Sequence, residues 1–188
     1  MGGEVDRAAD ALAAGQLVLY PTDTLYGLAA SATDASAVDR LLAAKDRPAQ
    51  MPISVAVSSL EEIEPLVTWT EQGRALARQI VPGPVTLLVR GSARARRSLA
   101  PPLIGPDGTI GIRVPDHPIA RELARRAGPL TATSANRHGE PPAASIGEAR
   151  RGFGDRIAVY LDLGPAPSGR PSTLVDLRGG TPRFVERR

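Results

Sequence analysis

The sequence contains no cysteine, which excludes disulfide bonds, thiolate zinc sites and thiol nucleophiles. It has only two histidines, His117 and His138, so a histidine metal site has little material to draw on. Aromatic residues make up 3% of the chain, which argues against stacking several bases of a nucleic acid on aromatic side chains. The core must therefore be built mostly from Ala, Val, Leu and Ile.

Long apolar runs are also missing, because the longest fall well short of the roughly 18 residues that a membrane helix needs. The first residues lack a basic start followed by an apolar stretch, which is the pattern of a secretion signal. We therefore expect no membrane association and a cytoplasmic location.

The composition that remains is typical of a soluble globular protein, with 42% hydrophobic and 23% charged residues. The length of 188 residues suits a single domain, 1–188, with a sizeable core. A net charge of +3 permits contact with phosphates and allows weak RNA binding. The densest basic segment contains Arg94, Arg96 and Arg97, and we interpret it as a solvated surface.

Apolar residues recur with helical spacing in some segments and with strand spacing in others, which predicts a mixed α/β domain. One expected helix begins at Asp34 or Ser36 and carries Lys45 at its C-terminal end. The other expected helices cover residues 5–14, 60–66, 71–80 and 118–127. The expected strands cover residues 16–20, 53–57, 85–89, 110–114, 130–133, 158–161, 172–176 and 183–186.

Lysine is nearly absent as well, because Lys45 is the only one among 23 Lys and Arg residues. A lysine ammonium is a compact, mobile point charge that suits a phosphate or a small anion, whereas arginine offers a rigid planar fork. Chance in an arginine-rich composition explains a lone lysine equally well. From composition alone, both interpretations stay open.

Polar side chains gather where apolar strands end. Thr22, Asp23 and Thr24 follow the first predicted strand, in a position that can present polar groups to a ligand. A capped turn, with Asp23 bonding its own backbone, is the alternative interpretation. Segment 131–136 carries hydroxyl and amide groups after another strand, and Arg113 lies inside a strand-like pattern where its charge needs a partner or a ligand.

Six short motifs occur in a fixed order along nearly the whole chain. They are Tyr20-Pro21-Thr22-Asp23-Thr24, Lys45-Asp46-Arg47-Pro48, Pro82-Gly83-Pro84-Val85-Thr86, Arg113-Val114-Pro115-Asp116-His117-Pro118, Ser134-Ala135-Asn136 and Pro171-Ser172-Thr173. With these motifs the sequence resembles the YrdC-like family of threonylcarbamoyladenylate synthases. The resemblance implies an α/β fold, with a twisted open mixed β-sheet that is flanked by helices and has a concave basic face.

The resemblance also implies an activity. Such enzymes condense L-threonine with bicarbonate or CO2, adenylate the product with ATP and release pyrophosphate. They pass threonylcarbamoyl-AMP to transferase proteins that modify transfer RNA. Mg²⁺ is expected to accompany ATP, with no metal site assigned to protein side chains.

Site roles follow by the same resemblance. Lys45 and Arg47 are predicted to be catalytic and to face the nucleotide phosphates and the carbamate. The predicted threonine contacts are Thr24, Arg113, Ser134 and Ser172, and the further nucleotide contacts are Thr109 and Asn136. Fixed cations suit this chemistry, because the carbamate and the nucleotide are both anions and repel each other.

The sequence departs from the family pattern at two places. Many relatives have a basic residue and a histidine after the Lys-x-Arg-Pro loop, where this chain has Met51 and Ala56. The sequence also ends soon after residues 183–186, so we expect no C-terminal extension domain of the kind that longer members carry.

Two other functions stay open at this point. One is a non-catalytic RNA-binding or ribosome-associated module of the same fold, which the arginine content suits. The other is a carbamoyl-adenylate enzyme that acts on a different carbamate. Enzymes of that second kind usually carry this domain fused to others.

Overall fold

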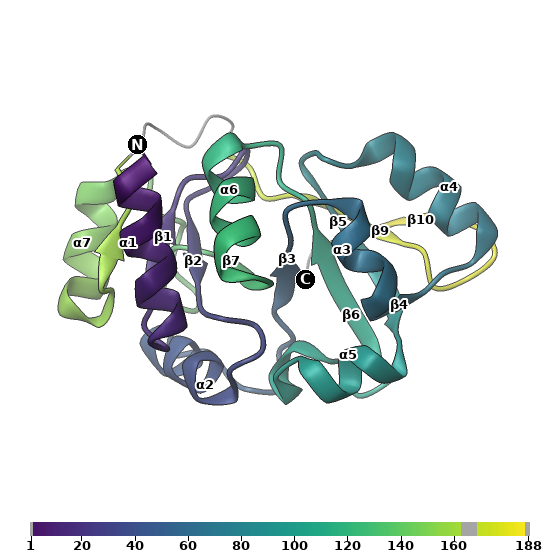
Figure 1. Ribbon diagram of the computed structural model, residues 1–188, viewed down its shortest axis with the longest axis horizontal. Coiled ribbons are helices and arrows are strands. Elements are labelled where there is room, and N and C mark those ends of the chain that lie inside the picture. Colours follow the sequence, from purple (N-terminus) through teal and green to yellow (C-terminus); the bar gives the residue numbers. More distant parts are fainter. Residues whose placement is uncertain (1, 163–168, 187–188) are drawn as a thin grey trace.

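Ten strands form one mixed sheet that is flanked by helices (Figure 1). The computed structural model describes residues 2–162 and 169–186. The helices are α1 (Gly2–Ala13), α2 (Ala35–Ala44), α3 (Leu60–Ile63), α4 (Glu71–Ile80), α5 (Ala93–Ser98), α6 (Pro118–Ala127) and α7 (Ile146–Phe153), with 3-10 helices η1 (Glu64–Leu66), η2 (Pro101–Leu103) and η3 (Gly154–Arg156). The strands are β1 (Val18–Tyr20), β2 (Gly27–Ala29), β3 (Ser54–Ala56), β4 (Val67–Thr68), β5 (Val85–Gly91), β6 (Thr109–Arg113), β7 (Leu130–Ser134), β8 (Val159–Tyr160), β9 (Thr173–Asp176) and β10 (Arg183–Val185).

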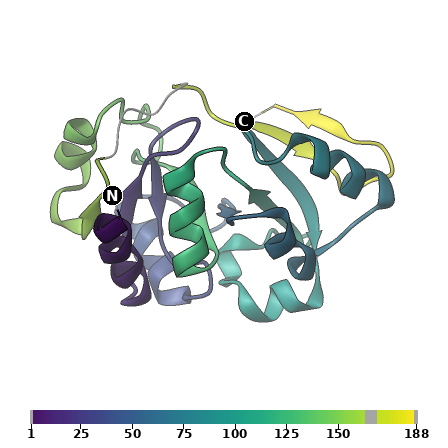
Figure 2. The same ribbon diagram turned by 45° about the horizontal axis from the view of Figure 1, so that its top comes forward.

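The strand order is β10-β9-β5-β6-β3-β7-β2-β1-β8, and β4 pairs with β5 outside this path. Three neighbouring pairs, β1 with β8, β3 with β6, and β5 with β9, run parallel, and the other pairs run antiparallel. The predicted α/β fold with an open mixed sheet is therefore confirmed. Figure 2 shows β9 and β10 at the edge of the molecule far from α1.

Buried side chains form one cluster on each face of the sheet. In β1, Val18 and Tyr20 belong to one cluster and Leu19 to the other, as the two-residue period of a strand requires. Helices α1 and α6 lie side by side over the first face, where Leu12 and Leu123 join that cluster (Figures 1 and 2). The larger cluster, on the other face, includes buried residues of α2, α5 and α7.

Local signals explain why α6 forms where the sequence predicts it. Pro118 occupies the first turn, where its missing N–H costs nothing, and Gly128 takes a positive φ of 80° after the last residue. Leu123 and Ile119, four residues apart, face the core together.

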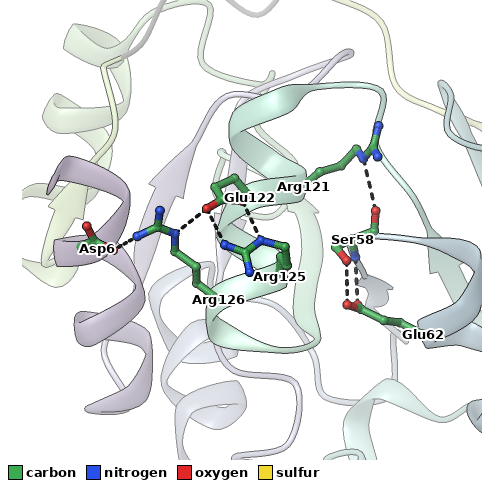
Figure 3. Close-up of polar contacts among 7 residues, drawn as sticks. All are labelled: Asp6, Ser58, Glu62, Arg121, Glu122, Arg125 and Arg126. Carbon is green, nitrogen blue, oxygen red and sulfur yellow. Dashed lines mark hydrogen bonds and ion pairs between the residues drawn. The ribbon is translucent and has the colours of Figure 1, made fainter. Parts of the chain in front are cut away.

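An ion pair on one side of α6 and a hydrogen bond on the other connect this helix to its neighbours (Figure 3). Arg126 contacts Asp6 of α1 and donates to Glu122 at 2.6 Å. On the other side, Arg121 Nε donates to the Ser58 main-chain oxygen at 3.2 Å. These contacts are exposed or partly exposed, so each contributes well under about 1 kcal/mol, and burial of the apolar face holds the helix.

Several expected boundaries differ from those observed. The helix expected at 60–66 is split into α3 and η1, because Pro65 has no N–H for a continuing helical bond. Strands β2 and β4 and helices α5 and α7 were not predicted from the sequence. The basic segment with Arg94, Arg96 and Arg97 forms the exposed side of α5, which confirms the solvated interpretation. No helix in residues 2–162 and 169–186 is long and apolar enough to cross a membrane.

Candidate active site

A cavity opens on the sheet face that carries α1 and α6, because Tyr20 and Ala56 belong both to that cluster and to the cavity lining. It encloses about 160 Å³. Strand register brings residues distant in sequence to its wall, with Gly27 of β2 opposite Ser134 of β7 and Ser54 of β3 opposite Ala132. Five predicted site residues, Thr24, Arg47, Arg113, Ser134 and Ser172, line this cavity together.

The cavity lining is cationic. Among the described residues, the charged side chains in the lining are Arg47 and Arg113, and no carboxylate lines it. The wider concave basic face that the resemblance implies stays a prediction.

Arg113 connects the end of β6 to the loop after β1. Its Nη2 donates to Asp23 Oδ1 at 2.5 Å and to Thr24 Oγ1 at 2.6 Å. Both ion-pair side chains are 11% exposed, so this pair is desolvated and its loss would be costly. A charged residue within a strand was expected to need a partner, and for Arg113 that partner is Asp23.

The turn after β1 is closed by Thr22 rather than by Asp23. Thr22 Oγ1 donates to the Leu25 main-chain oxygen at 2.6 Å and accepts from Thr24 N at 3.1 Å. The alternative in which Asp23 caps its own turn is thus wrong, because its Oδ1 binds Arg113.

The direction of these bonds fixes what Thr24 can offer a ligand. The Thr22 hydroxyl has one proton, which it donates to Leu25, so in its 3.1 Å contact with Thr24 Oγ1 it must accept. The Thr24 proton is therefore donated to Thr22, while Arg113 donates to Thr24. With its proton donated to Thr22, the Thr24 hydroxyl is better suited to accept from a ligand than to donate to one.

The backbone conformation at the C-terminus of α2 explains why Lys45 and Arg47 point in different directions. Asp46 takes a positive φ of 51°, and the N–H groups of Asp46 and Arg47 donate to Ala43 and Leu42 at 3.2 and 3.0 Å. These bonds are those of a Schellman cap, which reverses the chain after Lys45. Lys45 points into the protein and Arg47 towards the cavity.

Lys45 is 2% exposed and does not line the cavity. Its Nζ donates to the main-chain oxygens of Ser134 and Asn136, both at 2.5 Å, and its own carbonyl accepts from His138 N at 2.7 Å. Burial, and secondarily the charge of Arg47, lower the pKa of Lys45 from 10.5 to about 7. In this structure the ammonium holds the Ser-Ala-Asn turn from behind, and its predicted contact with phosphates stays a prediction.

Arg47 is placed by main-chain atoms. Its Nε donates to the Met51 oxygen and its Nη2 to the Pro52 oxygen, both at 3.2 Å. The Met51 side chain is exposed, and Ala56 lines the cavity, where it leaves room that a larger residue would fill.

The polar side chains of the Ser-Ala-Asn turn form hydrogen bonds within their own loop. Ser134 Oγ donates to Asn136 Oδ1 at 2.5 Å, and Asn136 Nδ2 donates to the oxygens of Arg137 and Glu140, both at 2.8 Å. The Asn136 amide is thus occupied within its own loop and lies outside the cavity lining. Like Thr24, Ser134 has donated its hydroxyl proton and offers an acceptor to the cavity.

Ser172 reaches the cavity from the segment that leads into β9, and its hydroxyl lies 2.8 Å from Thr86 Oγ1. Both residues are buried, at 5% and 2% exposure. Thr86 also lines the cavity, although no site role was predicted for it from the sequence. What identifies Thr86 is its burial next to Ser172, a residue that was predicted to contact the substrate threonine.

Thr109 lies at the other end of β6 from Arg113 and does not line the cavity. Its hydroxyl accepts from Arg178 Nη1 at 2.8 Å, and Arg178 also donates to Asp107 at 2.6 Å. Four residues of a strand span roughly 13 Å, so the structure separates Thr109 from the other predicted site residues.

Tyr20 packs on Gly27 and lines the cavity. Desolvation raises its pKa to about 12, so the phenol stays neutral. His117 precedes α6 without capping it through its side chain, and burial lowers its pKa although the charges of Asp23 and Asp116 oppose this.

Among the described residues, no group of three or more His, Cys, Asp or Glu side chains is placed to hold an ion. Mg²⁺ needs only one or two carboxylates when phosphates supply other ligands. The buried Asp23 Oδ2, which has no hydrogen-bond partner, is one such oxygen beside the cavity.

The Sua5/YciO/YrdC family, which is described as "Telomere recombination", matches residues 10–188 of this chain. The chain therefore belongs to this family. It is 46% identical over 179 residues to a Mycobacterium tuberculosis protein, an alignment that covers 95% of this chain and 81% of the relative. It is 39% identical over 180 residues to the threonylcarbamoyl-AMP synthase of Chromohalobacter salexigens, covering 93% of this chain and 95% of that protein.

The fold is similar to that of Pyrococcus abyssi Sua5 complexed with L-threonine, with a TM-score of 0.88 and 34% identity. That comparison covers 96% of this chain but 52% of the Sua5 chain, so this chain spans about half its length.

Proposed function

We propose that this chain is an L-threonylcarbamoyladenylate synthase, which makes threonylcarbamoyl-AMP and pyrophosphate from L-threonine, bicarbonate or CO2, and ATP. The observation that carries the proposal is the cavity itself, in which two arginines lie with the hydroxyls of Thr24 and Ser134, whose protons are donated to Thr22 and Asn136. An amino acid fits this pattern, because it brings a carboxylate for a cation and N–H and O–H donors for acceptors.

Arg113 is suited to the threonine carboxylate. Its Nη2 already donates to Asp23 and Thr24, while its buried Nε has no hydrogen-bond partner. The bond to Asp23 fixes the plane of the guanidinium, and pre-organised donors cost no reorganisation when charge arrives. Thr24 and Ser134 then accept from the donors of the amino acid.

The cavity volume of about 160 Å³ is smaller than the roughly 300 to 1,000 Å³ typical of drug-sized ligands. We therefore assign the amino acid to the cavity and the nucleotide to its mouth, beside Arg47. In the first step the threonine amine adds to CO2 and loses a proton to give the carbamate. In the second step a carbamate oxygen attacks the α-phosphorus of ATP, the new P–O bond forms, and the bond to the pyrophosphate leaving group breaks. This step makes the enzyme a nucleotidyltransferase.

Arg47 lines the cavity, and its charge would lower the repulsion between the carbamate and the phosphates. Mg²⁺ bound to ATP would neutralise phosphate charge further. No residue of the chain becomes covalently modified in this scheme, and positioning two reactants alone contributes up to about 7 to 11 kcal/mol. The adenylate then passes to transferase proteins that modify transfer RNA.

The test is to incubate the purified chain with ATP, Mg²⁺, bicarbonate and single amino acids, and to measure pyrophosphate and the adenylate. We expect product only when threonine and bicarbonate are both present. Serine should be used about 10- to 200-fold less efficiently, because one methyl group contributes about 1 to 3 kcal/mol to discrimination. Pyrophosphate release that does not depend on threonine, or none at all, contradicts the proposal.

RNA binding is the control measurement. If the chain is instead an RNA-binding module, it will bind RNA with an affinity that falls steeply with salt and will turn over no ATP.

A further inference from the structure

We propose that Thr86 is a positioning residue, which acts through the Ser172 hydroxyl to hold the amino-acid substrate. The proposal rests on the function proposed above and adds a residue from the Pro-Gly-Pro-x-Thr motif. Thr86 Oγ1 and Ser172 Oγ lie 2.8 Å apart, and the two residues are separated by 86 positions in the sequence.

The first step of the argument is burial. Thr86 is 2% exposed and Ser172 is 5% exposed, yet both line the cavity. A hydroxyl in such a place makes hydrogen bonds of fixed direction, because no bulk water competes for it. The Thr86 contact therefore restricts which way the Ser172 hydroxyl points.

The second step is the difference in backbone support between the two residues. Thr86 lies inside β5, where its pairing partner is Leu174 of β9, so its position is set by the sheet. Ser172 precedes β9, in a segment that crosses beside the cavity. Thr86 is thus the rigid member of the pair and Ser172 the member that it orients.

The third step is where that segment is tied down. Gly169 N donates to the Thr24 main-chain oxygen at 3.0 Å, and Thr173 N donates to the Pro84 oxygen at 2.9 Å. The segment between them carries Ser172 and Pro171 into the cavity lining. The bond between Thr86 and Ser172 is a side-chain tie within this stretch, and it links the motif at 82–86 to the predicted substrate contact.

The test compares Thr86→Val, which removes the hydroxyl and keeps the shape, with Thr131→Val. Thr131 is the matched control, because its hydroxyl is fully buried, bonds Leu28 and Ala30, and lies outside the cavity. We expect Thr86→Val to raise the KM for threonine about 3- to 10-fold with little change in kcat, as loss of one hydrogen bond to bound substrate predicts. Thr131→Val should leave KM unchanged.

Two further variants separate positioning from general damage. Thr86→Ser restores a hydroxyl and should return the KM to within about twofold of the starting value. In a Ser172→Ala background, Thr86→Val should have no further effect, because the group through which it acts is gone. If Thr86→Val does not fold, Thr86→Ala replaces it with the same expected result.

A normal KM in Thr86→Val, or an equal rise with and without the Ser172 hydroxyl, overturns the proposal. Failure of the unmodified chain to make any adenylate contradicts the proposed function instead, so the two failures are distinguishable. A rise in KM for Thr131→Val equal to that for Thr86→Val also overturns it, since loss of stability would then explain both.

Discussion

The Lys45 ammonium donates a 2.5 Å hydrogen bond to the main-chain oxygen of Asn136, 91 positions along the chain. Together with a second hydrogen bond from Lys45 to the Ser134 main-chain oxygen, it joins the end of α2 to the turn after β7. The lone lysine therefore shapes the site from behind the cavity wall, and its removal has two separable effects.

Lys45→Met should lower both activity and stability. Two partly buried carbonyl oxygens lose their donor, which costs about 1 to 3 kcal/mol in the free energy of unfolding. Pyrophosphate release should fall at least about 10-fold, because the turn that carries Ser134 loses its support. Lys45→Arg should also impair turnover, since the planar fork is bulkier than an ammonium. Urea unfolding and pyrophosphate assays check this, with Arg94→Gln on exposed α5 as control, and normal turnover in folded Lys45→Met contradicts it.

The Lys45 pKa predicts a dependence of stability on pH. The folded pKa is about 7 and the ordinary value 10.5, so between these values the unfolded chain binds more protons at this site. The contribution of Lys45 to the free energy of unfolding should therefore rise with pH from about 7 to 10. Relative to Lys45→Met, we expect a gain on the order of 1 to 3 kcal/mol between pH 7 and 9.5 in urea unfolding. A constant or falling difference would sink this prediction.

Arg113 and Asp23 allow stability and activity to be separated. Arg113→Ala leaves the Asp23 carboxylate buried and unpaired, which should destabilise the fold by about 3 to 5 kcal/mol. Adding Asp23→Asn should recover part of that stability, because the uncompensated charge is removed. Activity should remain lost in the double variant, since the proposed carboxylate partner is still absent. Recovery of activity together with stability would show that Arg113 has only a structural role.

Gly27→Ala should displace Tyr20 from the cavity wall. A Cβ at Gly27 would lie 2.7 Å from the Tyr20 ring, so the ring, which is 1% exposed, would have to shift from its packed position. We expect a loss of about 1 to 3 kcal/mol in thermal or urea unfolding, as overpacking predicts. Gly152→Ala is the matched control, because nothing lies within 4 Å of its added carbon and alanine favours α7. Equal stability of the two variants would refute the close packing.

Sequence periodicity predicted the long elements well and the short ones poorly. The expected bounds of α4 and α6 coincide with those observed, because Pro118 and Gly128 punctuate a clear apolar stripe in α6. Strand β2 has three residues, which is too few to show a period, and α7 contains two glycines that weaken a helical pattern.

The candidate site was predicted residue by residue, but its geometry was not. Thr109 and Arg113 share a strand, yet only the structure shows that they lie at opposite ends and that Thr109 contacts Arg178. Lys45 and Arg47 are two positions apart, and the left-handed conformation at Asp46 separates them. Thr86 was overlooked because its partner Ser172 is brought near only by the pairing of β5 with β9.

The Thr24 and Ser134 hydroxyls already donate their protons to Thr22 and Asn136, and this has a consequence for inhibitors of the cavity. A compound that places an ether or carbonyl oxygen against either hydroxyl is expected to bind weakly, because the hydroxyl must give up its bond to Thr22 or Asn136 before it can donate to the ligand. One that places an amine or amide N–H there, and an acid group at Arg113, satisfies every partner at once. Replacing a hydrogen-bond acceptor by a donor at a single atom should therefore distinguish good inhibitors from weak analogues of the same shape.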